Sequence, residues 1–108
     1  MDAFRDRERD EEAKFRHQQE LAFKIRNRRN KLFGLWVAEE FLGLSGEEAL
    51  AYAKDVVLAD FEGPGDDDMM EKVRRDLAAK GVEVSDHRLR KRLSELEEVA
   101  RAQVMDES

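Results

Sequence analysis

The residue types that most often catalyse reactions or bind metals are few in this chain, and their spacing suits neither task. Ser85, Asp86 and His87 have the side chains of a Ser–His–Asp triad, but three consecutive residues in one helical turn cannot adopt its geometry. His17 and His87 are the only histidines and cysteine is absent, so a typical zinc site is not expected. The acidic run 66–68 lacks the spacing and closing glutamate of a calcium loop, and no glycine-rich phosphate-binding motif occurs. We therefore expect no catalytic residue, no metal and no cofactor, and we expect that the protein is not an enzyme.

The composition predicts a small, highly charged, all-α protein. The chain has 108 residues, of which 43% are charged and 7% aromatic, with a single proline. One domain of modest core size fits this length, and a β-sandwich or an α/β enzyme does not fit this composition. The N-terminal sequence is charged where a signal peptide would be apolar, and no apolar run is long enough to span a membrane. We expect a soluble, intracellular protein.

Four helices are expected, because short breaker and capping signals divide the chain. Ser45 and Glu48 have the spacing of a capping box, and Ser85 is placed to cap a later helix. Pro64 lies between two glycines and cannot continue a helix, while Gly81 suits a helix C-terminus. Helices joined by such short loops most simply form a four-helix bundle. The expected ranges are about 3–42, 46–61, 66–80 and 86–104.

The first predicted helix changes character at Leu21. Among residues 1–20, twelve are charged, and the only large apolar side chains after Met1 are Phe4 and Phe15. From Leu21 onward an apolar stripe appears, which consists of Leu21, Ile25, Leu32, Leu35 or Trp36, and Leu42, widened by Phe33, Val37 and Phe41. A helix that is polar all round bridges other bodies or is only marginally stable alone. We therefore divide the chain into a projecting, mobile or marginally helical arm, residues 1–20, and a four-helix anchoring domain, residues 21–108.

Charge is distributed unevenly along the chain. Residues 1–31 carry ten basic and seven acidic side chains, whereas residues 32–108 carry ten basic and nineteen acidic ones. This asymmetry favours an oriented docking through the N-terminal end. The basic cluster within it consists of Lys24, Arg26, Arg28, Arg29 and Lys31. It allows two interpretations: an arginine-rich RNA-binding helix, or, as we favour, the solvated face of a packed helix, which could pair with the acidic body.

Five runs of residues resemble a known family. They are Asn27–Glu39 (NRRNKLFGLWVAE), Leu42–Gly46 (LGLSG), Ala51–Val57 (AYAKDVV), Ala59–Glu62 (ADFE) and Ser85–Arg88 (SDHR). In unbroken order, and over essentially the full chain, they resemble the zeta subunit, which is the ATPase inhibitor subunit of the F-type ATP synthase of alphaproteobacteria. The resemblance implies a four-helix, non-enzymatic protein that inhibits ATP hydrolysis. It also implies a cytoplasmic protein that is peripheral to the inner membrane through the synthase, and we expect a monomer when free.

The resemblance implies that the arm enters an alpha–beta catalytic interface and contacts the gamma shaft. Phe4 and Phe15 are eleven residues apart and would share one helical face as apolar anchors, and the basic side chains would pair with carboxylates of the subunits. His17 would make binding depend on pH, because a histidine changes charge near neutrality. The expected partner-binding residues are Phe4, Arg5, Arg7, Arg9, Lys14, Phe15, Arg16 and His17. No nucleic acid and no direct membrane contact are expected.

The arm departs from the family pattern at three positions. The family usually has a phenylalanine where this chain has Glu11, and acidic residues where it has Gln18 and Gln19. The missing aromatic side chain removes a possible anchor, whose burial contributes about 1.5–3 kcal/mol.

Overall fold

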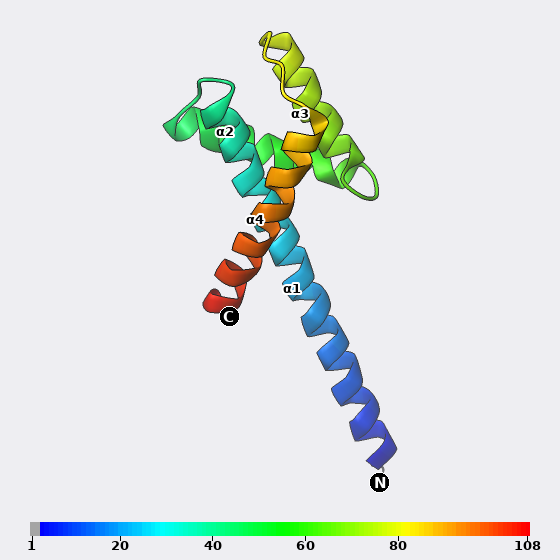
Figure 1. Cartoon of the computed structure of the whole chain (residues 1–108). Coiled ribbons are helices and arrows are strands. Elements are labelled where there is room, and N and C mark those ends of the chain that lie inside the picture. The colour runs from blue at the N-terminus through cyan, green and yellow to red at the C-terminus, as the bar shows by residue number, and fades with distance from the viewer. Residues whose placement is uncertain (1–2) are drawn as a thin grey trace.

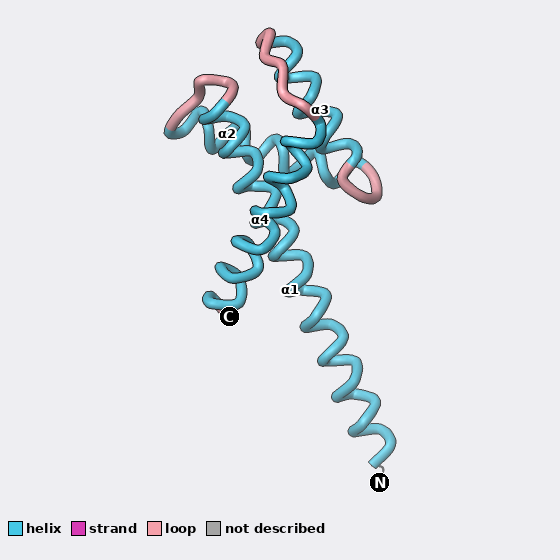
Figure 2. Tube along the Cα trace, in the orientation of Figure 1, coloured by secondary structure: helices cyan, strands magenta, loops and turns pink. Residues whose placement is uncertain are grey.

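The computed structural model describes the backbone of residues 3–108 and the side chains from residue 9 onward. Over that range the chain consists of helices joined by irregular loops, without a strand. The elements are α1 (Ala3–Glu40), α2 (Gly46–Ala59), the short 3-10 helix η1 (Asp60–Glu62), α3 (Asp67–Ala79) and α4 (Asp86–Glu107) (Figures 1 and 2). The predicted all-α fold with four helices is therefore confirmed. No helix in the described part of the chain is long and apolar enough to cross a membrane.

The long helix α1 organises the other three. Helices α2 and α4 both pack against the C-terminal half of α1, and α3 contacts α2 and η1 at the end opposite the N-terminus (Figure 1). The N-terminal half of α1 extends away from this body, which gives the molecule a longest dimension of 67 Å. The helices thus cross around one end of α1 and leave its other end free.

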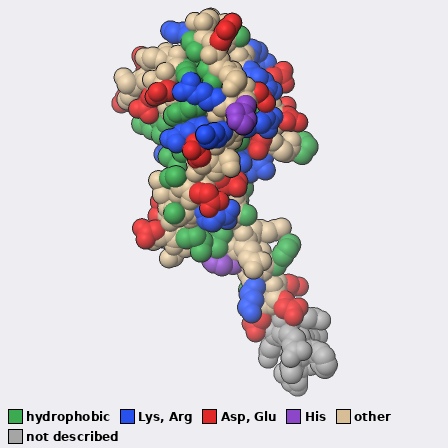
Figure 3. All heavy atoms as spheres, in the orientation of Figure 1, with side chains coloured by type: hydrophobic (Ala, Val, Ile, Leu, Met, Phe, Trp, Pro, Cys, Tyr) green, Lys and Arg blue, Asp and Glu red, His purple; other side chains and the backbone are tan. Residues whose placement is uncertain are grey.

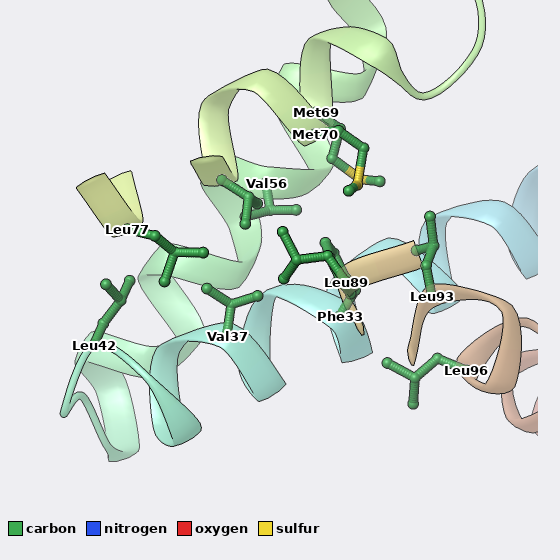
Figure 4. Packing of buried hydrophobic residues seen from close by; sticks show 11 residues of the cluster. Phe33, Val37, Leu42, Val56, Met69, Met70, Leu77, Leu89, Leu93 and Leu96 are labelled. Carbon is green, nitrogen blue, oxygen red and sulfur yellow. The ribbon is translucent and has the colours of Figure 1, made fainter. Parts of the chain in front are cut away.

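The main core lies where side chains from all four helices meet (Figure 4). Phe33 and Val37 are fully buried on α1, whereas Leu32 and Trp36 are only partly buried at its edge. The expected apolar stripe was therefore centred about one residue away from the side of α1 that is buried. The reason is that α2 and α4 cover different sides of α1, so the buried part of its circumference is wider than a single stripe. The other helices contribute Val56, Met69, Met70, Val73, Leu77, Leu89, Leu93 and Leu96. A smaller cluster of Ile25, Ala100 and Val104 joins α1 to the C-terminal half of α4.

Gly34 allows α1 and α2 to approach closely. A Cβ atom at this position would lie 2.7 Å from the Cα of Ala53 and 3.1 Å from the Cβ of Val56. Such distances leave no room for a side chain, so the crossing depends on the absence of a Cβ atom at Gly34. The sequence shows only a glycine inside a helical pattern, and its packing role was not predicted.

The two expected N-caps have different outcomes. The Oγ of Ser85 accepts a hydrogen bond from the backbone N–H of Arg88 at 3.1 Å, which confirms the cap of α4. Ser45 precedes α2 but makes no side-chain cap hydrogen bond, so the predicted capping box is wrong. The reason is local, because Gly46 has a positive φ of 55° and does not present the first turn of the helix to the Ser45 hydroxyl in the usual geometry.

The end of α2 also differs from the expectation. The helix ends at Ala59, and η1 then turns the chain at Asp60–Glu62. As a result Phe61, the last residue of the expected helix 46–61, is 56% exposed, while Asp60 is only 5% exposed. A carboxylate is thus buried beside α1, where it binds Arg26 and Asn30.

Candidate functional site

The N-terminal part of α1 is a helix without a covered face. All side chains from Arg9 to Glu20 are exposed, and Phe15 is 62% exposed. None of them makes a hydrogen bond or an ion pair with another described side chain. Figure 3 shows this segment as a narrow, largely charged extension of the broader body. Its exposed surface is available to a partner along its whole described length.

The predicted partner-binding residues can be placed in part. Five lie on the exposed part of α1, and these are Arg9, Lys14, Phe15, Arg16 and His17. Three lie outside the residues whose side chains the structure describes, and these are Phe4, Arg5 and Arg7. The backbone of α1 is helical at both Phe4 and Phe15. Their separation of eleven residues is about three turns, so both positions fall on one side of the helix.

A buried carboxylate fixes the point where α1 enters the body. Asp60 accepts hydrogen bonds from Arg26 Nε at 2.6 Å, from Arg26 Nη2 at 3.0 Å and from Asn30 Nδ2 at 2.8 Å. Asn30 is fully buried, so its amide depends on these internal partners. The hydrogen bond to Asp60 raises the pKa of Arg26 above its ordinary value, which favours the charged guanidinium.

The same network continues to α3 and α4. Arg29 is 7% exposed; its Nη2 lies 2.6 Å from Asp66 at the start of α3, and its Nη1 lies 3.4 Å from Glu97 on α4. The Nε of Arg29 also donates a hydrogen bond to the side-chain oxygen of Asn30 at 3.0 Å. Because Arg29 is buried, these bonds constrain the orientation of α1 more strongly than a surface ion pair would.

Arg28 binds the C-terminal end of α4. Its two terminal nitrogens donate to the two oxygens of Glu107 at 2.7 and 2.8 Å, and Nη1 also donates to Gln103 at 2.9 Å. The hydrogen bonds between the two side chains raise the pKa of Arg28 and lower the pKa of Glu107. The guanidinium is thus occupied by a fork-like contact within the chain.

The expected pairing of the basic cluster with the acidic body is confirmed for its arginines. The expectation of a solvated face is wrong for Arg29, because α3 and α4 leave it only 7% exposed. Arg26, Arg28 and Arg29 all bind carboxylates of the body. Lys24 and Lys31 are exposed and form no ion pair with a described side chain. This arrangement favours the packed-face interpretation over an RNA site, because the arginines are no longer free to bind phosphates. Among the described residues, no group of histidines and acidic side chains is placed to hold a metal ion.

Comparison with known proteins identifies the family. The family described as ATPase inhibitor subunit zeta matches residues 1–103, which is nearly the whole chain. The chain belongs to this family. It is therefore an ATPase inhibitor by family, a regulatory and not a catalytic kind of protein, and family membership implies an interaction with an ATP synthase.

The solved structures agree with the fold. Three solved chains match this sequence. One of them, determined in solution by NMR, is 52% identical, and the alignment covers 80% of this chain and 96% of that chain with a TM-score of 0.70. No curated protein matches the sequence.

Proposed function

We propose that the chain inhibits ATP hydrolysis by the F-type ATP synthase through mechanical blockage. Its arm, residues 1–20, enters an interface between an alpha and a beta subunit and lies against the rotating gamma shaft. The shaft then cannot turn in the direction that hydrolysis requires. The observation that carries this proposal is the run of exposed side chains from Arg9 to Glu20 on a helix continuous with the packed body.

The arm residues have two proposed roles. Phe4 and Phe15 are apolar anchors on one side of the helix, and an exposed ring such as that of Phe15 gains most when a partner buries it. The basic side chains pair with carboxylates of the catalytic subunits, and His17 adds a charge that depends on pH. The proposed basic contacts are Arg5, Arg7, Arg9, Lys14 and Arg16.

The remainder of the chain, residues 21–108, is the proposed anchoring domain. The hydrogen bonds of Arg26 and Asn30 to Asp60, and of Arg29 to Asp66, hold α1 in one direction relative to this domain. The arm is therefore presented in a defined orientation before binding, which lowers the entropy lost on association. We place the protein in the cytoplasm as a monomer when free, peripheral to the inner membrane through the synthase and without nucleic acid.

The departure at Glu11 limits the expected affinity. Glu11 precedes Phe15 by about one turn, so the two residues lie on the same side of α1. A carboxylate on the anchor side cannot contribute the burial of an aromatic ring, which amounts to about 1.5–3 kcal/mol. We expect weaker inhibition than by family members that have phenylalanine there.

The experiment is a titration of ATP hydrolysis by the purified catalytic sector of the synthase. The full chain is compared with a version that starts at Glu20, and helical content and urea unfolding confirm that both are folded. Inhibition by the full chain and not by the shortened one is the expected result, because the shortened version lacks residues 1–19 and with them every proposed contact residue of the arm. Equal inhibition by both would disprove the role of the arm, and failure of the full chain to bind would disprove the proposed function.

A further inference from the structure

A groove runs along the surface of α1 just after the arm. It has a volume of about 540 Å³ and lies between α2 and α4. It is lined from α1 by Phe23, Lys24, Asn27, Arg28 and Lys31, from α2 by Val57, and from α4 by Val104 and Glu107. We refer to it below as the root groove. Its walls contain both apolar and basic side chains, unlike the core of the protein, which is apolar.

Phe23, which lines the root groove, forms an exposed aromatic pair with Phe61 beside the groove. Phe23 is 54% exposed and Phe61 is 56% exposed, and their ring centroids are 5.9 Å apart. A second hollow of about 300 Å³ adjoins the pair, and both rings line it. Aromatic side chains that are exposed and already held in place are typical anchors of protein interfaces, because little conformational freedom remains to be lost. The pair therefore marks a surface suited to an apolar side chain of a partner.

The charges of the root groove favour an acidic partner. Arg28 is already bound to Glu107 by two hydrogen bonds. Lys24 and Lys31 lie about two turns apart on α1 and form no ion pair with a described side chain. The groove is lined by three cations, Lys24, Arg28 and Lys31, and by one carboxylate, Glu107, so its net charge is positive. A positive groove beside an apolar surface matches a helix that has carboxylates next to one large apolar residue.

The root groove is continuous with the arm. Phe23 follows Phe15 by eight residues on the same helix, which is a distance of about 12 Å. A subunit that binds Phe15 therefore reaches the start of the root groove if it contacts the next two turns of α1. α4 begins to cover α1 close to the root groove, since Leu21 packs against the cluster that contains Ala100 and Val104 of α4.

We propose that the root groove is a second docking site, which binds an acidic, amphipathic helix of the catalytic sector through Phe23, Phe61 and the two free lysines. This inference rests on the proposed function and adds a contact of the anchoring domain to that of the arm. Its occupant belongs to the same catalytic-sector assembly that receives the arm. The arm blocks rotation, and the root groove adds affinity and fixes the direction of entry.

The test measures the affinity of full-length variants for the purified catalytic sector. Phe23→Gln should weaken binding by about tenfold or more, as truncation of an aromatic anchor commonly does. The matched control is Leu50→Gln, because Leu50 is 49% exposed on α2 and lies outside the root groove. This control should bind like the wild type. Both variants should keep the urea midpoint of the wild type, because both side chains are about half exposed.

A charge variant makes the test independent of the aromatic ring. Lys24→Glu should weaken binding most at low salt, whereas the control Lys54→Glu on α2 should not, because a lost ion pair at an interface rim is screened by salt. Equal affinity of Phe23→Gln and wild type would overturn the inference. So would a Phe23→Gln variant that only abolishes self-association, or a Lys24→Glu variant that loses only binding to an RNA oligonucleotide. If the wild type itself does not bind the catalytic sector, the proposed function fails, and the inference fails with it.

Discussion

Replacement of Asp60 by alanine should destabilise the protein strongly, because it removes a buried carboxylate that binds α1. Asp60 is 5% exposed and accepts three hydrogen bonds from two side chains of α1. In Asp60→Ala the buried Nδ2 of Asn30 loses its acceptor, at a cost of about 1–3 kcal/mol. Arg26 is 42% exposed in its side chain and can turn toward water, so the loss of its ion pair adds at most about 1 kcal/mol. We expect a total loss of about 2–3 kcal/mol in the free energy of unfolding.

The assay is urea unfolding followed by the circular dichroism of the helices. A loss of 2–3 kcal/mol should lower the urea midpoint by about 1 M or more, because a domain of this size has a slope of about 1–3 kcal/mol per M urea. Asp86→Ala is a matched control. Asp86 also binds two arginines, Arg74 and Arg90, but its side chain is 50% exposed. Its removal should shift the midpoint much less, since water replaces the lost partners.

The result that would refute this reasoning is a similar midpoint shift for Asp60→Ala and Asp86→Ala. It would mean that burial does not distinguish the two carboxylates and that the network does not hold α1. Asp60→Asn gives a second test, because the asparagine oxygen can still accept the hydrogen bond from Asn30. Asp60→Asn should therefore lose less free energy of unfolding than Asp60→Ala. An equal loss would mean that the negative charge of Asp60, and not its hydrogen bond with Asn30, provides the stability.

Four further predictions concern the arm, the crossing of α1 and α2 at Gly34, and the hydroxyl group of Tyr52. Phe15→Ala should weaken binding to the catalytic sector by about 1.5–3 kcal/mol, more than removal of any single arm charge, and equal losses in a titration of ATP hydrolysis would rule out the anchor role. His17→Gln should flatten the pH profile of inhibition near neutrality, and an unchanged profile would exclude His17 as its source. Gly34→Ala should lower the free energy of unfolding by about 1–2 kcal/mol despite alanine's higher helix propensity, because the new methyl group meets Ala53; a raised urea midpoint would contradict this. Tyr52 is the only tyrosine, and burial followed by a hydrogen bond to a carboxylate raises its pKa above the usual range. Its contribution to stability is therefore complete below about pH 10 and declines above it, and absorbance should show no tyrosinate at about pH 11 before the chain unfolds.

The number and order of the helices could be predicted because local signals divide the chain. The break at Pro64, the cap at Ser85 and the stop at Gly81 each act within a few residues, and the structure agrees with all three. At Gly81 the backbone completes a C-terminal motif, in which the N–H of Val82 donates to the carbonyl of Leu77 at 2.9 Å. Such signals need no knowledge of the tertiary fold. The exposure of residues 9–20 could be predicted in the same way, because this segment has no apolar stripe.

The contacts that orient α1 could not be predicted from the sequence. Arg26 and Asp60 are separated by 34 residues, and nothing in the pattern indicates which of the many acidic residues approaches which arginine. The position of Asp60 depends on the end of α2 at Ala59, two residues earlier than expected. Gly34 is a similar case, because a glycine inside a helical pattern indicates a close contact only when the crossing partner is known.

The continuity of α1 explains how so charged a segment can serve as a helical arm. Formation of the first turn is the unfavourable step in helix formation, whereas each later residue adds a hydrogen bond for one residue fixed. In α1 the packed half around Phe33 and Val37 supplies the existing turns, so residues before Leu21 need only extend a helix that is already held. An isolated peptide of the same sequence would have to form its own first turn without an apolar face. In the proposed mechanism the anchoring domain would therefore contribute to inhibition in two ways, since it would dock the protein and also supply the helix from which the arm extends.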